Sequence, residues 1–315
     1  MEPPAGYTIR PATADDAAQI AELMNAVTVA EIGLPWTTAE EVRNVLTSPG
    51  RDPALPDLLL LGPDRAPVGH VTFDVVAEPL QIEQLPAVRP ELWGRGLNAW
   101  LLRLGEERAR ERSAGAGGVL RVARFTSNRS AGRLFEALGY TYVRTFWMMR
   151  IELDDAPPSP RLPEGIEIRT FEPSRDEIPT HAALAEGFAG HWGYRFPSFE
   201  EWHHEELGES SSFDPGLWFL ATKGEDVIGA ALCRSSSPRS EDTALVGDLT
   251  VREPWRRRGI ALALLQTAFT EFHRRGIPRA ELSVDAANPT GATRLYEHAG
   301  MREAFSWDFW EKPIA

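Results

Sequence analysis

The sequence predicts an α/β (α+β) fold repeated in two tandem lobes, each with a mixed central sheet flanked by helices. The chain has 315 residues, which is enough for two domains of about 150 residues each. A proline-rich run at 154–165 shows no apolar period and has the composition of a linker. We therefore expect a first lobe at 1–153, a linker at 154–165 and a second lobe at 166–315.

Short motifs recur on both sides of this linker in the same order. The spacing stays between 159 and 163 residues for five landmark pairs: Ile9 with Ile168, Val68 with Ile228, Gly96 with Gly259, Asn128 with Asn288, and Gly139 with Gly300. Chance similarity does not keep both order and register over this many positions, and a fixed period indicates an internal repeat. The two lobes are therefore predicted to share one fold, by duplication.

The elements of each lobe follow one order, seen most clearly in the second. Ser174 and Glu177 have capping-box spacing before a helical run, as do Thr13 and Asp16 in the first lobe. The β-rich runs at 218–221 and 227–233 flank a polar turn and predict a hairpin. A third strand is expected at 243–251.

The last part of the second lobe alternates helix, strand and helix. Apolar residues recur with a helical period after Gly259 and stop before Gly276. Residues 281–284 alternate like a half-buried strand. Asn288 with Pro289 predicts the cap and first turn of a final helix that Gly300 ends.

Three consecutive arginines, Arg256, Arg257 and Arg258, lie where the helix after the third strand begins. A helix N-terminus already presents partial positive charge and free N–H groups, so cations are unfavourable there. A bound phosphate would explain them, because amides, dipole and guanidinium groups would all face the anion. Gly259 would let the backbone approach it closely. The alternative is a solvated basic turn.

This stretch resembles the GCN5-related N-acetyltransferase (GNAT) family, whose pyrophosphate loop reads Arg/Gln-x-x-Gly-x-Gly/Ala. Arg256, Gly259 and Ala261 match that pattern, and a second family pattern is matched downstream by Asn288, Gly291, Leu295, Tyr296 and Gly300. The resemblance covers both lobes. It implies an acetyl-CoA-dependent N-acetyltransferase that acts on a small-molecule amine by direct transfer in a ternary complex, with no metal.

The resemblance also implies where acetyl-CoA binds. The main chain of Leu249, Thr250 and Val251 would pair with the pantetheine arm like an added strand, and the amide near Val251 would polarise the acetyl carbonyl. The pyrophosphate would be held by the turn and the start of the helix, at Arg256, Arg257, Arg258, Gly259, Ile260, Ala261 and Leu262. Asn288 is expected near the cofactor, although an N-cap role would explain it without any ligand.

Two side chains are candidates for proton transfer. Tyr296 would protonate the leaving thiolate, or else serve only as a core aromatic on an apolar helix face. Asp248 is the carboxylate on the predicted central strand, where alternation places it on the face of Thr250 and opposite Val251. It would take a proton from the incoming ammonium. The alternatives are that Asp248 pairs with a nearby arginine or that a water chain removes the proton.

The first lobe departs from the family pattern at four functional positions. Trp93 replaces the first arginine of the turn, Asn98 the second small residue, Leu85 the candidate base and Phe135 the candidate acid. Gly96 and the framework of helices and strands remain. We expect this lobe to be catalytically silent, with a structural role.

The acceptor pocket is predicted in the aromatic segment from His191 and Trp192 through Trp202 and the pair His203-His204, because that region lines the acceptor in the family. For the tryptophans, packing between the lobes is the alternative. Adjacent helical histidines point about 100° apart, so no metal site is expected. The sequence leaves open the acceptor itself, including an antibiotic or amino sugar, and the oligomeric state.

Composition bounds the remaining possibilities. With 33 basic and 46 acidic residues the net charge is −13, which argues against a nucleic-acid or anionic membrane partner. The start of the chain lacks a basic end followed by an apolar core, so we expect a cytoplasmic protein. The lone Cys233 is expected in the core.

Two other functions remain as alternatives to an N-acetyltransferase: a non-catalytic acetyl-CoA sensor or assembly module, and aminoacyl transfer from tRNA.

Overall fold

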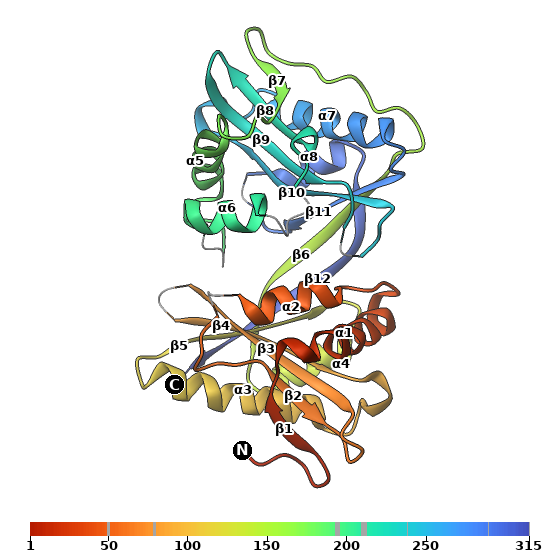
Figure 1. The fold of residues 1–315 in the computed structure, drawn as a ribbon, viewed down its shortest axis with the longest axis vertical. Coiled ribbons are helices and arrows are strands. Elements are labelled where there is room, and N and C mark those ends of the chain that lie inside the picture. Colours follow the sequence, from red (N-terminus) through yellow and green to blue (C-terminus); the bar gives the residue numbers. More distant parts are fainter. Residues whose placement is uncertain are drawn as a thin grey trace. The chain divides into compact units, whose positions relative to one another are not determined.

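The computed structural model describes residues 1–48, 51–77, 80–192, 196–208, 213–237, 239–288 and 290–314. The chain forms two compact units. The first consists of Met1–Phe146 with Phe305–Ala315, and the second of Trp147–Ala304. The predicted mixed α/β fold is present in both units (Figure 1).

The unit boundaries differ from the expected lobes at 1–153 and 166–315. Strands β6 (Thr141–Glu152) and β12 (Arg302–Ile314) each run from one unit into the other. The end of β12 pairs antiparallel with β5 (Gly118–Phe125) from Trp307–Phe125 to Ile314–Gly118, so the last strand of the chain completes the sheet of the first unit. Period-2 patterning predicts a strand but carries no information on its pairing partner.

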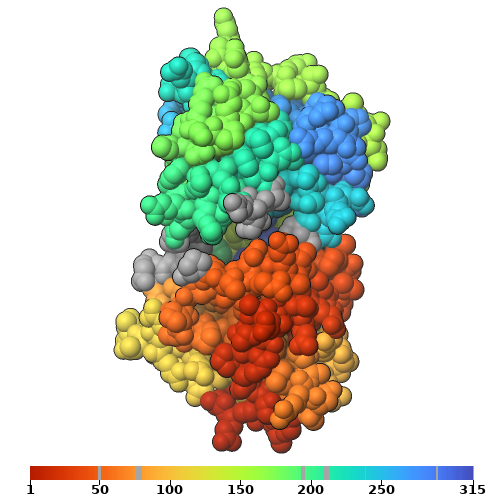
Figure 2. Space-filling view, in the orientation of Figure 1, coloured from red at the N-terminus to blue at the C-terminus, as the bar shows by residue number. Residues whose placement is uncertain are grey.

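The first unit has the sheet order β1-β2-β3-β4-β5-β12-β6, in which β4 and β5 are parallel. Helices α1 and α2 cover one face by packing on Leu59, and α3 and α4 cover the other through Leu58 and Leu60. Residues near the N-terminus, red to orange, form much of its visible surface in Figure 2. Its remaining elements are β1 (Thr8–Pro11), α1 (Ala17–Ile32), α2 (Ala39–Thr47), β2 (Leu58–Leu61), β3 (Pro67–Ala77), β4 (Gln81–Val88), α3 (Leu97–Ser113) and α4 (Arg129–Ala137), with short 3-10 turns at Ala14–Asp16 and Pro90–Leu92.

The second unit has the sheet order β7-β8-β9-β10-β11-β6. The expected hairpin is confirmed as β8 (Trp218–Lys223) and β9 (Asp226–Arg234), and the expected third strand as β10 (Thr243–Val251). Helix α7 (Ile260–Arg274) and strand β11 (Arg279–Asp285) follow as predicted. The other elements are β7 (Glu167–Thr170), α5 (Glu177–Phe188), α6 (Phe199–Leu207) and α8 (Ala292–His298), with 3-10 turns at Pro215–Leu217 and Glu253–Trp255.

Two hydrophobic clusters lie on opposite faces of the second sheet. One joins the sheet to α5 and α6, and the other joins it to α7 and α8, with the two sets of helices on either side in Figure 1. Cys233 is fully buried in the α7–α8 cluster, which confirms it as a core residue.

The final helix begins later than its predicted cap. The N-cap of α8 is Gly291, in the left-handed region at φ 81°, rather than Asn288. The Asn288 Oδ1 instead accepts from the backbone N of Thr290 at 2.9 Å and so closes a turn before the helix. Pro289 lies outside the described residues. An Asn-x-x pattern serves a cap and a turn equally, so the sequence did not separate the two.

The repeated Ile-Arg landmark has the same structural function in both units. Arg10 on β1 forms a two-bond ion pair with Asp16, with its shortest contact at 2.6 Å. Arg169 on β7 does the same with Asp176, including a bond of 2.8 Å. Each pair ties the first strand of its unit to the start of the following helix. The two units therefore share a contact as well as a motif.

Candidate active site

The central strand of the second unit parts from its parallel neighbour. The ladder between β10 and β11 runs from Thr243–Arg279 to Leu245–Glu281 and ends there. On its other side, β10 stays paired with β9 as far as Val251–Gly229. The predicted pantetheine-binding residues Leu249, Thr250 and Val251 therefore lie on the splayed part of the strand. That edge is suited to the addition of an extended ligand, as in strand addition by peptides.

A β-bulge precedes the candidate base. The register shifts between Val246, opposite Cys233, and Asp248, opposite Leu232, so Gly247 is the extra residue. Directly opposed residues of an antiparallel pair share a face. Cys233 and Val246 belong to the α7–α8 cluster, whereas Leu232 belongs to the α5–α6 cluster. The bulge therefore places Asp248 on the α5–α6 face, whereas strict alternation from Val246 would place it on the α7–α8 face.

Asp248 and Thr250 share that face, and Val251 lies on the other, as alternation from Asp248 onward predicts. Thr250 marks a close approach of α5 to the strand, because any Cβ at Gly187 would lie 1.6 Å from the Thr250 Oγ1. Helix α5 is therefore fixed directly over the face that carries the carboxylate.

The environment of Asp248 suits a base at neutral pH. The pKa of Asp248 is raised to about 7, mainly by burial and in smaller part by the charge of Glu206 on α6, while Arg234 acts to lower it. Arg234 is itself paired with Glu206 at 3.0 Å, so its charge is partly compensated. A carboxyl group with this pKa exchanges a proton readily near pH 7.

Tyr296 lies on α8 and is 8% exposed. It belongs to the hydrophobic cluster that also holds Val251, at the end of the splayed strand, and Ile260, the first residue of α7. Burial raises the pKa of Tyr296 to about 12, so the phenol keeps its proton at neutral pH. The position agrees with both predicted roles, since the ring packs in the core and a protonated hydroxyl can serve as an acid.

The arginine turn has a different construction from the one expected. The Arg256 Nε donates to the Val251 carbonyl at 2.9 Å, and Arg258 donates to the Pro254 carbonyl at 3.1 Å while lying over the Trp255 ring. Two of the three guanidinium groups thus hold the turn together by donating to carbonyls at the end of β10 and in the 3-10 turn that follows it. Arg257 adopts a left-handed φ of 63°.

The start of α7 remains suited to an anion. Its N-cap, Gly259, has φ 82° and supplies no side-chain acceptor to the first amides of the helix. Those amides, at Ile260, Ala261 and Leu262, need an acceptor from elsewhere. The residues present therefore fit the pyrophosphate of acetyl-CoA through the main chain more than through arginine side chains.

The first unit reproduces this turn with a different residue. The Trp93 Nε1 donates to the Val88 carbonyl at 2.7 Å, the same bond that Arg256 makes to Val251. Gly96 has φ 81° and caps α3 as Gly259 caps α7. The replacement of arginine by Trp93 therefore preserves the turn, which the sequence interpretation missed. The available signal was that both side chains carry an N–H donor.

The two departures of the first unit at the candidate base and acid, Leu85 and Phe135, are apolar. Phe135 is buried against Tyr140 and Trp310, with ring centroids 6.1 and 6.0 Å away. Leu85 lies on β4, opposite Thr72 of β3. Neither residue supplies a titratable group.

The aromatic segment of the second unit divides between core and candidate pocket. Burial lowers the pKa of His191, Arg256 lowers it further and Asp285 opposes this, so His191 lies within electrostatic range of the arginine turn. Trp192 follows and is half-buried. Trp202 is 2% exposed and packs on Trp218 at 5.8 Å within the α5–α6 cluster, so it is a core residue of its own unit.

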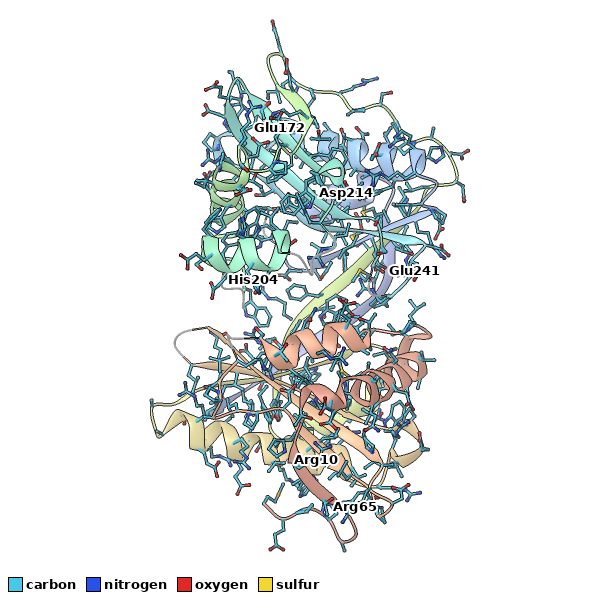
Figure 3. The ribbon with its side chains drawn as sticks, in the orientation of Figure 1. Arg10, Arg65, Glu172, His204, Asp214 and Glu241 are labelled. Atoms are coloured by element: carbon cyan, nitrogen blue, oxygen red, sulfur yellow. The ribbon has the colours of Figure 1, made fainter. Side chains whose placement is uncertain are left out.

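The adjacent histidines lie on the surface of α6. His203 is exposed with its Nε2 3.6 Å from Glu177, and His204, labelled in Figure 3, is also exposed. Among the described residues, no group of three or more His, Cys, Asp or Glu side chains is placed to hold a metal ion. A search of the described helices found none long and apolar enough to cross a membrane.

A splayed central strand, a carboxylate with a raised pKa beside it and a helix N-terminus open to an anion agree with the acetyltransferase class, which the comparisons show for this chain. Residues 35–140 and 185–301 match the acetyltransferase (GNAT) family, and the chain belongs to that family. Its two units form a tandem of the GNAT fold.

Similar proteins include both solved structures and curated relatives. A GCN5-related N-acetyltransferase from Sphaerobacter thermophilus has 36% identity and a TM-score of 0.81, over 99% of this chain and 96% of that one. The mycothiol acetyltransferase of Thermobispora bispora is 34% identical over 68% of this chain and 70% of its own length. That of Streptomyces coelicolor is 28% identical over 93% and 94%. A tandem GNAT protein from the clavulanic acid pathway, 15% identical with a TM-score of 0.74, shares the fold.

The similarity to mycothiol synthase agrees with features of the sequence itself. The chain has a similar length, the same two-lobe arrangement, and the segment Phe188-Ala-Gly-His191, which resembles that enzyme. That resemblance leads us to expect an acid further upstream on the central strand, whereas the acid within β10 is Asp248.

Proposed function

We propose that the second unit transfers the acetyl group of acetyl-CoA directly to the amine of a small molecule bound at the same time. The observation that carries this proposal is Asp248, a carboxyl group with a pKa of about 7 beside the splayed part of β10. A carboxylate of ordinary pKa would be a weak base for an ammonium, whereas one near 7 is matched to the operating pH.

Different residues bind acetyl-CoA and transfer the protons of the reaction. The main chain of Leu249, Thr250 and Val251 pairs with the pantetheine arm, and the first amides of α7 hold the pyrophosphate. Asp248 accepts a proton from the acceptor's ammonium, which frees the nitrogen lone pair. As the new N–C bond forms and the C–S bond breaks, the amide near Val251 stabilises charge on the carbonyl oxygen. Tyr296 then gives its proton to the departing sulfur, and the second proton, which the acylated nitrogen loses, restores the phenol.

The acceptor is a small-molecule amine that enters on the α5–α6 face. Asp248 lies on that face, and His191 and Trp192 follow α5, where we assign the acceptor side of the site. Because the curated relatives are mycothiol acetyltransferases, the first acceptor to assay is the amine precursor of mycothiol. Because Asp248 does not lie where the resemblance to mycothiol synthase expects the acid, an amino sugar or aminoglycoside antibiotic is the next choice. The first unit contributes no catalytic group.

The test is a thiol-release assay with acetyl-CoA and a panel of amines containing the mycothiol precursor, amino sugars and aminoglycosides. Release of CoA that depends on one amine, with the N-acetylated product found by mass spectrometry, supports the proposal. Asp248→Asn should lower kcat with that amine. If acetyl-CoA binds tightly but neither Asp248→Asn nor Tyr296→Phe changes the rate with any acceptor, the assigned chemistry is wrong.

A further inference from the structure

One guanidinium group of the arginine turn has no structural role. Arg256 and Arg258 donate to main-chain carbonyls, whereas the exposed Arg257 makes no hydrogen bond or ion pair with any residue that the structure describes. Its backbone is left-handed, at φ 63°, and the corresponding residue of the first unit is Gly94, at φ 79°. The first unit therefore meets this backbone requirement with the residue that adopts it freely, while the second unit keeps a long cationic side chain there.

A second arginine, Arg294 on α8, reaches the same place. A Cβ atom added at Gly291 would lie 3.3 Å from the Arg294 Nη2 and 3.7 Å from the Arg257 Nη1. Both nitrogens therefore lie within 4 Å of one point beside this glycine. Arg294 is exposed, and it too has no hydrogen-bond or ion-pair partner in the described part of the chain. Two guanidinium groups, one from the turn and one from α8, thus converge at the surface of the second unit.

These two positive charges converge without a carboxylate between them. Next to the same turn, Arg252 lies 2.9 Å from Glu186, and in the first unit Arg124 lies 3.8 Å from Glu31. The pair beside Gly291 lacks such a partner among the described residues, and like charges in proximity repel. An anion from outside the chain would remove this repulsion. A phosphate suits the position, because its oxygens can accept charge-assisted hydrogen bonds from both guanidinium groups at once.

Coenzyme A carries negative charge in two places, the pyrophosphate and the 3′-phosphate of the ribose. We have assigned the pyrophosphate to the first main-chain amides of α7, which leaves the 3′-phosphate without a binding group. A phosphate monoester carries a charge of about −1.5 to −2 at pH 7. That charge matches two guanidinium groups better than the single charge on each phosphate of the pyrophosphate does.

We propose that Arg257 and Arg294 together bind the 3′-phosphate of acetyl-CoA and make the second unit selective for it over the 3′-dephospho form. The proposal rests on acetyl-CoA as the donor in the function proposed above, and adds to it a choice between donors. The main-chain contacts assigned to the pantetheine arm and the pyrophosphate do not supply this choice, because both donors have these parts in common.

The first unit provides a matched control. Arg133 precedes Phe135 by two residues, as Arg294 precedes Tyr296, and it is also exposed on its helix. The turn of this unit has Gly94, so Arg133 has no second guanidinium group with which to complete a site.

The test is calorimetric titration of the full chain with coenzyme A and with 3′-dephospho-coenzyme A, in the absence of any acceptor. We expect coenzyme A to bind at least tenfold more tightly. Arg294→Gln should weaken coenzyme A about tenfold and leave the dephospho form within twofold. Arg257→Gly should do the same without a fall in Tm, because glycine adopts the left-handed backbone freely. Arg133→Gln should change neither affinity.

Three results would overturn the proposal. They are equal affinity of the unaltered protein for the two ligands, an equal loss for both ligands in Arg294→Gln, which would put this arginine on the pyrophosphate, and no change in either arginine variant of the second unit. If Arg257→Gly lowers Tm, Arg257→Asn replaces it, since asparagine tolerates the left-handed region. The titration needs no acceptor. The preference for coenzyme A can therefore hold when no amine is acetylated, and can be absent when one is, so the two proposals fail separately.

Discussion

The two glycine turns offer a matched pair of substitutions that separates the units by function. Gly259 has φ 82° and ψ −2°, and Gly96 has φ 81° and ψ −1°. Each is the N-cap of a long helix, and at each an added Cβ would meet no atom within 4 Å. Glutamate at either position therefore carries the same left-handed strain, about 1–2 kcal/mol, and the same new charge.

The difference between the two variants then reports on phosphate binding. In Gly259→Glu, a carboxylate lies near the pyrophosphate, and two unit charges 4 Å apart repel by about 4 kcal/mol at an effective dielectric of 20. That corresponds to a fall in kcat/KM for acetyl-CoA of roughly a thousandfold. Gly96→Glu should stay within about threefold of the unaltered protein, because its turn has no part in turnover.

The assay is thiol release at varied acetyl-CoA concentration, with Tm measured for both variants. Similar Tm values confirm that the strain is matched. Gly259→Ala should retain most of the activity lost in Gly259→Glu, since it adds the strain without the charge. Loss of activity in Gly96→Glu with retention in Gly259→Glu, or equal loss in both, would refute the assignment of the working unit.

Further predictions concern proton transfer, the first unit's turn and acid stability. The value of kcat/KM should rise with pH through about 7, because Asp248 must be unprotonated to act as a base. Asp248→Asn should remove this rise from the pH profile and lower kcat about a hundredfold or more. A rise that persists in the variant would assign the titration to another group. Tyr296→Phe should lower kcat about tenfold to a hundredfold with little change in Tm. The effect should be smallest with an acyl donor whose thiol leaves as a stable anion. A fall in Tm without a fall in kcat would make the tyrosine a core aromatic only. Trp93→Phe removes the indole N–H bond to the strand end, so the free energy of unfolding should fall by about 1 kcal/mol with kcat unchanged, and a loss of turnover would give the first unit a part in the chemistry. Hydrogen bonds from Arg10 hold the pKa of Asp16 well below its usual range. The pair therefore stabilises the fold above the unfolded pKa of about 4, and this stabilisation is lost as pH falls through the lower folded pKa. The free energy of unfolding, measured with denaturant from pH 7 to pH 2, should fall less steeply in Asp16→Asn, and equal slopes would show that the pair does not contribute.

Much of the fold follows from local patterns. The hairpin, the strand at 243–251 and the helix after Gly259 are each specified by alternation, apolar period and turn residues within a few positions. The repeat predicts two units from motif spacing alone. The start of α8 was misplaced because Asn288 closes a turn four residues before the helix begins, and short-range signals do not separate a turn from a cap.

Local patterns also allowed part of the candidate site to be predicted from the sequence. The patterns around Arg256 and Tyr296 are contiguous in sequence and identify the family. The bulge at Gly247 was not predicted, because a bulge is a mismatch between two strands and is defined only once β9 and β10 are paired. The shared bond of Arg256 and Trp93 was missed since it depends on where a distant carbonyl lies.

The sequence by itself determined the internal repeat, the order of elements, the family and the segment where acetyl-CoA chemistry is expected. Tertiary structure alone decided which strand completes each sheet, which face Asp248 occupies, how far burial raises its pKa, and that Glu31 meets Arg124 in the first unit. The division has one physical cause. Backbone preferences and side-chain periods act over a few residues, whereas pairing, burial and charge compensation depend on groups that only folding brings together.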